Sequence, residues 1–112
     1  MATVLSVEDL RSSSTAARFE GGRHGSTVSF FITDHPPGSR VDLHRHPYEE
    51  TFIVRGGKAT FSVDGQSIDA HEGQIVIVPA GAVHGFVSDG PEALLLIGIH
   101  PAGWIEQEQV EE

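Results

Sequence analysis

From residue 28 onward, short runs of apolar and alternating residues recur along the chain, and turn residues close each run. This spacing is typical of an all-β sandwich or barrel, in which successive side chains of a strand point to opposite faces. The runs are Val28–Thr33, Val41–His46, Thr51–Val54, Lys58–Val63, Gln66–Ala70, Gln74–Val78, His84–Val87 and Ala93–Ile99. Asp64-Gly65 is the strongest hairpin signal. We therefore predict one small antiparallel β-barrel over residues 28–100.

The two ends of the chain lack this pattern. In residues 1–27, a serine-rich run and Gly21-Gly22 interrupt any period, so we expect a weakly structured N-terminal arm or an edge strand. Residues 101–112 form an acidic C-terminal tail, in which Trp104–Val110 could form a short amphipathic helical turn. At this length we expect one domain, because chains usually divide only beyond about 250 residues.

Composition excludes several classes of function. The 112 residues carry 7 Lys and Arg against 16 Asp and Glu, a formal charge of −9, and the basic residues are scattered singly, which argues against nucleic-acid binding. With no cysteine there is no thiolate metal site and no cysteine nucleophile. The longest apolar stretch, Ala93–Ile99, is far shorter than the roughly 20 residues of a spanning helix. We expect a cytoplasmic protein with no membrane partner.

Histidine is the unusual feature, because the seven histidines equal Lys and Arg together. On a regular strand His44 and His46 share one face, and Asp42 should share it too, with residues 41, 43 and 45 on the other face. The turn at Pro47 then brings Glu50 back toward the pair. Such a pair can equally be two exposed polar residues. Alone, it is therefore only half of a possible metal site.

A further histidine follows a predicted buried strand. Ile75-Val76-Ile77-Val78 leads into the turn Pro79-Ala80-Gly81, and the chain re-enters the barrel at His84. This imidazole could be a third nitrogen ligand or a hydrogen-bonded group of the core. Both interpretations stay open from the residues alone.

Two spaced motifs carry a resemblance to a known family. The pattern G-x5-H-x-H-x3-E-x6-G matches Gly38, His44, His46, Glu50 and Gly57 at every spacing, and G-x5-P-x-G-x2-H-x3-N matches Gly73, Pro79, Gly81 and His84, with Ser88 in place of the final Asn. The chain resembles the cupins, and in particular their small single-domain microbial members. The two motifs span residues 38–88.

The resemblance implies a double-stranded β-helix, related to jelly rolls, that forms homodimers. It also implies one divalent transition metal per chain (Fe, Mn, Ni, Cu or Zn), bound by His44, His46, Glu50 and His84. Ser88 lies outside this ligand set. Because the ligands must be deprotonated, we expect the metal affinity to fall as the pH drops through the histidine range near about 6.5.

Cupins perform many reactions, so the fold does not fix the function. We expect a metal-dependent cupin acting on a small organic molecule. We favour a dioxygenase-like oxygenase, because an open site of three histidines and one glutamate resembles that of the dioxygenase members of the family. The alternatives are a metal-dependent isomerase, lyase or cyclase, with Glu50 or Tyr48 handling protons, and a non-catalytic cupin that binds or senses a small molecule.

Other residues receive weaker interpretations. Strand parity places Phe52, Val54 and Phe86 on the inward face, where they either line an apolar pocket or simply pack in the core. Tyr48 could donate a hydrogen bond to a substrate or lie at the rim. We expect surface positions for the histidines outside the motifs, which are His24, His35, His71 and His100. A carboxylate substrate could be recognised by Arg40, Arg45 or Arg55, but the sequence places none of them inside the barrel.

Overall fold

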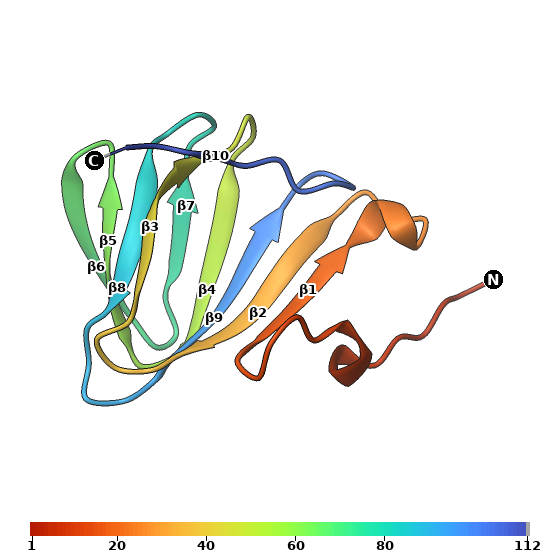
Figure 1. Ribbon diagram of the computed structural model, residues 1–112, viewed down its shortest axis with the longest axis horizontal. Coiled ribbons are helices and arrows are strands. Elements are labelled where there is room, and N and C mark those ends of the chain that lie inside the picture. Colours follow the sequence, from red (N-terminus) through yellow and green to blue (C-terminus); the bar gives the residue numbers. More distant parts are fainter. Residues whose placement is uncertain (112) are drawn as a thin grey trace.

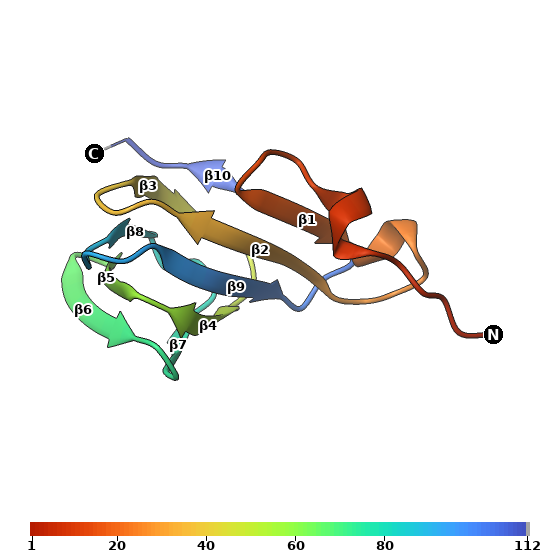
Figure 2. The ribbon, with the colours of Figure 1, turned by 90° about the horizontal axis from the view of Figure 1, so that it is seen from below.

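The computed structural model describes residues 1–111 and consists of two five-stranded antiparallel sheets that enclose a common core (Figures 1 and 2). The first sheet has the order β1 (Ala16–Glu20), β2 (Ser29–His35), β9 (Leu94–His100), β4 (Glu50–Gly56) and β7 (Ile75–Val78). The second has the order β10 (Glu108–Gln109), β3 (Arg40–Arg45), β8 (His84–Ser88), β5 (Lys58–Val63) and β6 (Gln66–His71). The predicted all-β, double-stranded β-helix fold is confirmed.

The helices in residues 1–111 are two short 3-10 turns, η1 (Val7–Leu10) and η2 (Gly21–Arg23). No helix within this range is long and apolar enough to cross a membrane.

The strands from β2 to β9 follow the predicted runs closely, because alternation and turn residues specify both their positions and their ends. Between β5 and β6, Asp64 and Gly65 have positive φ angles of 47° and 81°. Two central residues of positive φ are what a two-residue hairpin of the favoured hand requires. The predicted hairpin is therefore present.

The core lies between the inner faces of the two sheets. Its buried members come from both sheets and from the turns that join them, and they include Phe52, Val54, Ala59, Phe61, Val78, Phe86, Leu94 and Leu96. Each buried Phe or Leu side chain contributes roughly 1.5–3 kcal/mol through its removal from water. The alternate positions point outward, and Ile75 and Ile77 on the edge strand β7 are 62% and 67% exposed.

The N-terminal region provides the edge strand β1, which pairs along its whole length with β2. The C-terminal tail differs from our expectation, because the helical turn predicted over residues 104–110 is absent. Glu108 and Gln109 instead pair with β3, and the amide of Val110 donates to the carbonyl of Leu43 at 3.0 Å. The open edge of β3 offers these backbone partners. Figure 1 shows the tail, in dark blue, crossing the ends of several strands.

Strand β3 carries a β-bulge that overturns the predicted face of Asp42. The pairs on either side of the irregularity are Val41↔Phe86 and His44↔His84, so Asp42 and Leu43 together oppose the single Gly85. The extra residue shifts the alternation by one position. Asp42 is therefore exposed, whereas Val41 packs against the core. His44 still points inward.

The bulge depends on the absence of a side chain at Gly85. A Cβ atom there would lie 2.5 Å from the carbonyl oxygen of Val41, closer than real Cβ contacts allow. The two strands thus approach each other closely at the point where the extra residue is accommodated, just before the first histidine of the candidate site.

Candidate metal centre

Four side chains from three parts of the chain converge at one end of the barrel. His44 lies near the end of β3 and His46 just beyond it, while Glu50 begins β4 and His84 begins β8. All four are buried, and one ligand atom from each lies within 4.8 Å of the others. His44 and His84 are directly opposite each other in the β3–β8 ladder. The four residues that the motifs singled out thus form one cluster.

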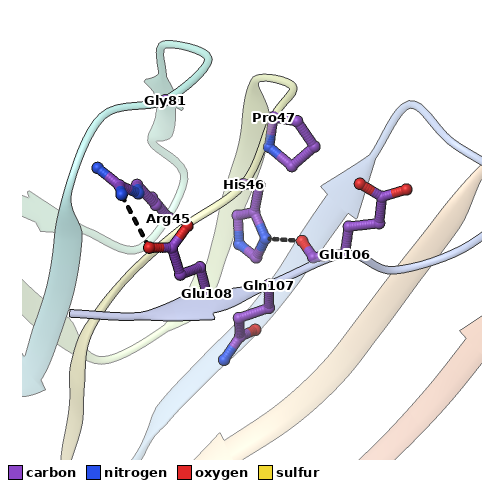
Figure 3. A pocket seen from close by; sticks show the side chains of 7 residues that line it. All are labelled: Arg45, His46, Pro47, Gly81, Glu106, Gln107 and Glu108. Carbon is purple, nitrogen blue, oxygen red and sulfur yellow. Dashed lines mark hydrogen bonds and ion pairs between the residues drawn. The ribbon is translucent and has the colours of Figure 1, made fainter.

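Backbone carbonyls orient the three imidazoles. Nδ1 of His44 lies 2.8 Å from the carbonyl oxygen of Asp42, and Nδ1 of His84 lies 2.9 Å from that of Ala82. Nδ1 of His46 lies 2.7 Å from the carbonyl oxygen of Glu106 in the C-terminal tail (Figure 3). A carbonyl oxygen only accepts, so each Nδ1 carries the proton and each neutral ring keeps a lone pair on Nε2.

These lone pairs meet a carboxylate. Nε2 of His46 and Nε2 of His84 lie 3.1 Å and 3.2 Å from Oε1 of Glu50. Within residues 1–111, Nε2 of His46 is buried without a hydrogen-bond partner of good geometry. Buried acceptors that face one another require a cation between them, either protons or a metal ion. The donor set therefore fits a divalent metal held by three neutral imidazoles and one carboxylate.

The electrostatics agree with an ionised carboxylate in this cluster. Burial acts to raise the pKa of Glu50, but the imidazoles of His100, His46 and His84 outweigh it and lower that pKa well below its usual value. Burial lowers the pKa of His44, so this ring stays neutral to lower pH. Burial opposes protonation of His46 as well, but Glu50 and the Glu106 carbonyl outweigh it and raise the pKa of His46.

A fifth polar side chain, which sequence reasoning missed, touches the cluster. His100, the last residue of β9, is 1% exposed, so the expected surface position is wrong. Its Nε2 lies 3.0 Å from Oε2 of Glu50, and its Nδ1 lies 2.8 Å from the hydroxyl of Tyr48. The alternation of β9 could have revealed it, because His100 has the parity of the buried Leu94 and Leu96.

Tyr48 lies beside the cluster with its hydroxyl already engaged. The hydroxyl contacts Nδ1 of His100 and accepts a hydrogen bond from the amide of Glu106 at 3.1 Å. Burial raises the pKa of Tyr48, which keeps the phenol neutral. The residues that line the cavity next to the cluster do not include Tyr48.

That cavity extends from the cluster into the barrel and has a volume of about 170 Å³. Most of its surface is apolar, and Phe and aliphatic side chains contribute much of it, while polar groups lie at the cluster, in the tail and at the far end of β2. The lining residues are Phe31, Thr33, His35, Val41, His44, His46, Glu50, Phe52, Phe86, Leu96, Gly98, His100 and Gln107. Two of the expected pocket residues, Phe52 and Phe86, thus line it. Val54 is instead buried in the core, away from the lining.

No Lys or Arg side chain of residues 1–111 is among the lining residues. Arg45 forms an exposed ion pair with Glu108 at 2.8 Å, outside the barrel (Figure 3). Arg40 likewise pairs with Asp42 at the surface, at 3.2 Å. Arg55 lines a separate surface pocket. Among the described residues, the cavity therefore has no Lys or Arg side chain that could recognise a carboxylate.

The remaining histidines divide between surface and cavity. His71 is exposed and His24 stacks on Phe19, with ring centroids 5.3 Å apart. His35 is half-buried and lines the cavity, where its Nε2 lies 2.8 Å from the hydroxyl of Thr33. Its pKa is lowered by burial, which outweighs the nearby Asp34. The expected surface position therefore does not hold for His35.

Ser88, which replaces the motif asparagine, joins the two sheets. Its side chain is buried and its hydroxyl donates to the carbonyl oxygen of His35 at 3.2 Å. Its backbone forms hydrogen bonds with Gly38 and Ser39, each 2.8 Å long. The departure from the motif therefore concerns the joint between β8 and the β2–β3 turn, and not the metal cluster.

Comparison with known proteins places the fold and the motifs in one family. The model of the cupin domain matches residues 31–100, which is more than half of the chain and includes all four cluster residues. The chain is a cupin. A 55-residue segment is 40% identical to quercetin 2,3-dioxygenase of Bacillus subtilis, covering 48% of the chain and 16% of that enzyme. The cupin thus spans about a sixth of the length of this curated relative.

Solved structures share the fold at low sequence identity. An uncharacterised conserved protein of Klebsiella pneumoniae with a double-stranded β-helix domain matches over 100% of both chains, with a TM-score of 0.76 and 23% identity. The oxalate decarboxylase of Lactobacillus farciminis, solved as a formate complex, matches 92% of this cupin and 34% of its own chain, with a TM-score of 0.82 and 20% identity. These similarities support the architecture of the barrel alone.

Proposed function

We propose that this cupin binds one divalent transition metal through His44, His46, Glu50 and His84 and acts as an oxygenase on a small organic molecule. The observation that supports the proposal most strongly is the convergence of three imidazoles and Glu50 beside a cavity whose surface is mostly apolar. Fe, Mn, Ni, Cu and Zn all suit mixed imidazole and carboxylate ligation. When bound, such a metal supplies Lewis acidity and, for the redox-active ions, a means of activating dioxygen.

The cavity supports a substrate of about one ring in size. Its volume of about 170 Å³ is close to the roughly 150 Å³ of an engineered apolar cavity that binds benzene. The aromatic and aliphatic lining favours an apolar body, and the absence of Lys and Arg from that lining disfavours a dianionic substrate. We propose a small phenol, enol or diketone whose oxygen atoms face the cluster.

The chain's own residues have defined parts in this proposal. Phe52 and Phe86 contact the body of the substrate and exclude water, while His35 and Thr33 provide a polar group at the far end of the cavity. The engaged hydroxyl of Tyr48 supports an oxygenase over an isomerase or lyase that relies on this tyrosine for proton transfer. The partial similarity to quercetin 2,3-dioxygenase agrees with this preference.

The metal is tested by elemental analysis of protein purified without chelator. We expect about one transition metal per chain in the wild type and a sharp loss in His84→Ala, because one of the four proposed ligands is removed. The matched control is His71→Ala, which changes an exposed histidine and should retain the metal. A wild-type protein that neither contains nor takes up a metal would overturn the proposal.

The reaction is tested by oxygen uptake with a panel that contains catechol, a 1,3-diketone, a small thiol and quercetin. Uptake with a one-ring substrate, abolished in His84→Ala and kept in His71→Ala, is the expected result. Conversion without oxygen uptake would instead indicate an isomerase, lyase or cyclase. Saturable binding without conversion would indicate a sensing cupin. Either result would overturn the oxygenase assignment.

A further inference from the structure

His100 is a buried histidine that lies outside both sequence motifs and yet reaches the metal cluster. It is 1% exposed and lies at the end of β9. Its Nε2 atom is 3.0 Å from Oε2 of Glu50, the carboxylate oxygen that faces away from His46 and His84. The contact is not well aligned, but within residues 1–111 Nε2 has no other hydrogen-bond partner. Glu50 is therefore the one described group with which Nε2 can interact.

The partners of its two ring nitrogens indicate which nitrogen of His100 carries the proton. Nδ1 lies 2.8 Å from the hydroxyl of Tyr48, whose oxygen also accepts from the amide of Glu106 at 3.1 Å. A hydroxyl can either donate to Nδ1 or accept from it, so the group that faces Nε2 decides. That group is the carboxylate oxygen Oε2 of Glu50 at 3.0 Å, which only accepts when ionised. The proton of His100 therefore belongs on Nε2, and Nδ1 accepts from Tyr48.

This tautomer is the reverse of that in the three clustered histidines. His44, His46 and His84 each donate from Nδ1 to a backbone carbonyl and keep a lone pair on Nε2. His100 instead presents an N–H to the cluster. It therefore lacks the lone pair that a metal ligand needs, and it provides the donor that a carboxylate ligand needs on its second oxygen.

The surrounding backbone leaves room for this contact. A Cβ atom at Gly98, two residues before His100 on the same face of β9, would lie 2.6 Å from Oε2 of Glu50. The glycine thus allows the carboxylate to lie against β9 within reach of the imidazole. Thr51, which follows Glu50, pairs with Ile99 in the β4–β9 ladder, so the two strands hold Glu50 and His100 at adjacent positions.

We propose that His100 is a positioning residue that holds the second oxygen of Glu50, so that Oε1 alone is directed at the metal. Tyr48 supports this arrangement from the other side of the ring, because its hydroxyl donates to Nδ1 of His100 and so keeps the proton on Nε2. This inference rests on the proposed metal site and deepens it, because it assigns a function to two residues that the motifs leave without one. It also explains why a histidine, and not an apolar residue, ends β9 inside the barrel.

The test compares Co²⁺ binding by chelator competition in His100→Leu, His100→Gln and Tyr48→Phe. His100→Leu should weaken Co²⁺ binding by about 10–100-fold, the usual effect of removing an outer partner of a metal ligand. It should also change the visible absorption of the bound Co²⁺, because Glu50 is no longer held. His100→Gln places an amide donor near Nε2 and should restore most of the affinity. Tyr48→Phe should give a smaller loss than His100→Leu.

The double variant separates positioning from a merely structural role. In a Glu50→Ala background, His100→Leu should cause no further loss of Co²⁺ affinity, because the group that it holds is already gone. The matched control His71→Leu changes an exposed histidine and should leave both affinity and spectrum unchanged. Thermal unfolding of each metal-free variant shows whether it is folded, and Tyr48→Phe and His100→Gln keep the test decisive if His100→Leu does not fold.

Each contrary outcome has a distinct meaning. Wild-type affinity in folded His100→Leu would overturn the inference and leave the metal site intact. Additive losses with Glu50→Ala, or a His100→Gln variant as weak as His100→Leu, would make His100 a ligand or a packing residue and would also overturn it. Failure of the wild-type chain to bind Co²⁺ would overturn the proposed metal site itself, and this inference with it.

Discussion

The backbone carbonyl oxygen of Glu106 lies 2.7 Å from Nδ1 of His46, so the C-terminal tail orients one imidazole of the cluster. The tail is held over the end of β3 by the β10 pairing and by the exposed Arg45–Glu108 ion pair. Exposed ion pairs contribute at most about 1 kcal/mol. The backbone hydrogen bonds of the tail therefore contribute more to its position over β3 than this ion pair does.

Removal of residues 105–112 should weaken Co²⁺ binding by about 10–100-fold, because His46 loses the acceptor that fixes its tautomer and orientation. Chelator competition measures the loss, and circular dichroism checks that the barrel remains folded. The matched control is Glu106→Ala, which keeps the carbonyl oxygen and should bind as the wild type does. A folded truncated protein with wild-type affinity would contradict this account of the tail.

Gly98→Ala should reduce the metal affinity by about tenfold or more, because the new methyl group would lie 2.6 Å from Oε2 of Glu50 and must displace the carboxylate. The control is Gly90→Ala, at a turn where a Cβ atom would meet its nearest neighbour at 3.6 Å. We expect the control to match the wild type in both metal affinity and melting temperature. Equal behaviour of the two variants would show that the carboxylate tolerates the added carbon.

Phe61→Ala should destabilise the barrel by about 3–5 kcal/mol, the usual cost of deleting a fully buried aromatic side chain. Phe61 is completely buried on β5 and its ring packs near Phe52 and Phe86, with centroid distances of 5.0 Å and 5.2 Å. Urea unfolding of the metal-free protein measures the change. Ile77→Ala, at an exposed position of β7, should stay within about 0.5 kcal/mol of the wild type.

Glu20 should make the stability depend on pH. The amide of Ile105 donates to this carboxylate at 3.1 Å, and this hydrogen bond lowers the pKa of Glu20. Burial acts in the opposite direction, but Arg18 and Arg23 also lower the pKa, which ends below its usual value. A folded-state pKa below the unfolded value of about 4.3 contributes stability at neutral pH that is lost as the pH falls through the folded pKa. Glu20→Gln should therefore destabilise the protein at neutral pH and cease to matter in acid.

Urea unfolding of the wild type and of Glu20→Gln, carried out from neutral pH to below about pH 4, tests this sign. The difference between the two proteins should shrink steadily as the pH falls. A difference that stays constant, or that grows in acid, would show that Glu20 stabilises the tail connection by packing and not by its charge.

The barrel from β2 to β9 was predictable from sequence because alternation and turn chemistry act locally. Lys58–Val63, for example, is predicted and observed with the same bounds. Edge strands are harder to predict. Ala16–Glu20 contains two alanines with low strand preference, and it forms β1 by pairing with β2 rather than through its own pattern.

The candidate cluster was predictable because its four residues match the motifs of a known family, whereas strand parity alone left the role of His84 open. The surroundings of the cluster were not predictable. The bulge at Asp42 arises from the close approach of Gly85, a tertiary contact that strand parity cannot include. The contact between Glu106 and His46 joins residues 60 positions apart. The homodimer, the cytoplasmic location and the small-molecule partner stay predictions.

The three clustered imidazoles are all oriented by main-chain oxygens, at Asp42, Ala82 and Glu106. Any amino acid can supply a carbonyl, so the orientation of the rings does not depend on the type of side chain at these three positions. A designer who transplants the four ligands into another barrel must reproduce the course of the backbone, namely the bulge, the turn before β8 and the crossing tail. Copying the neighbouring residue types would not be enough.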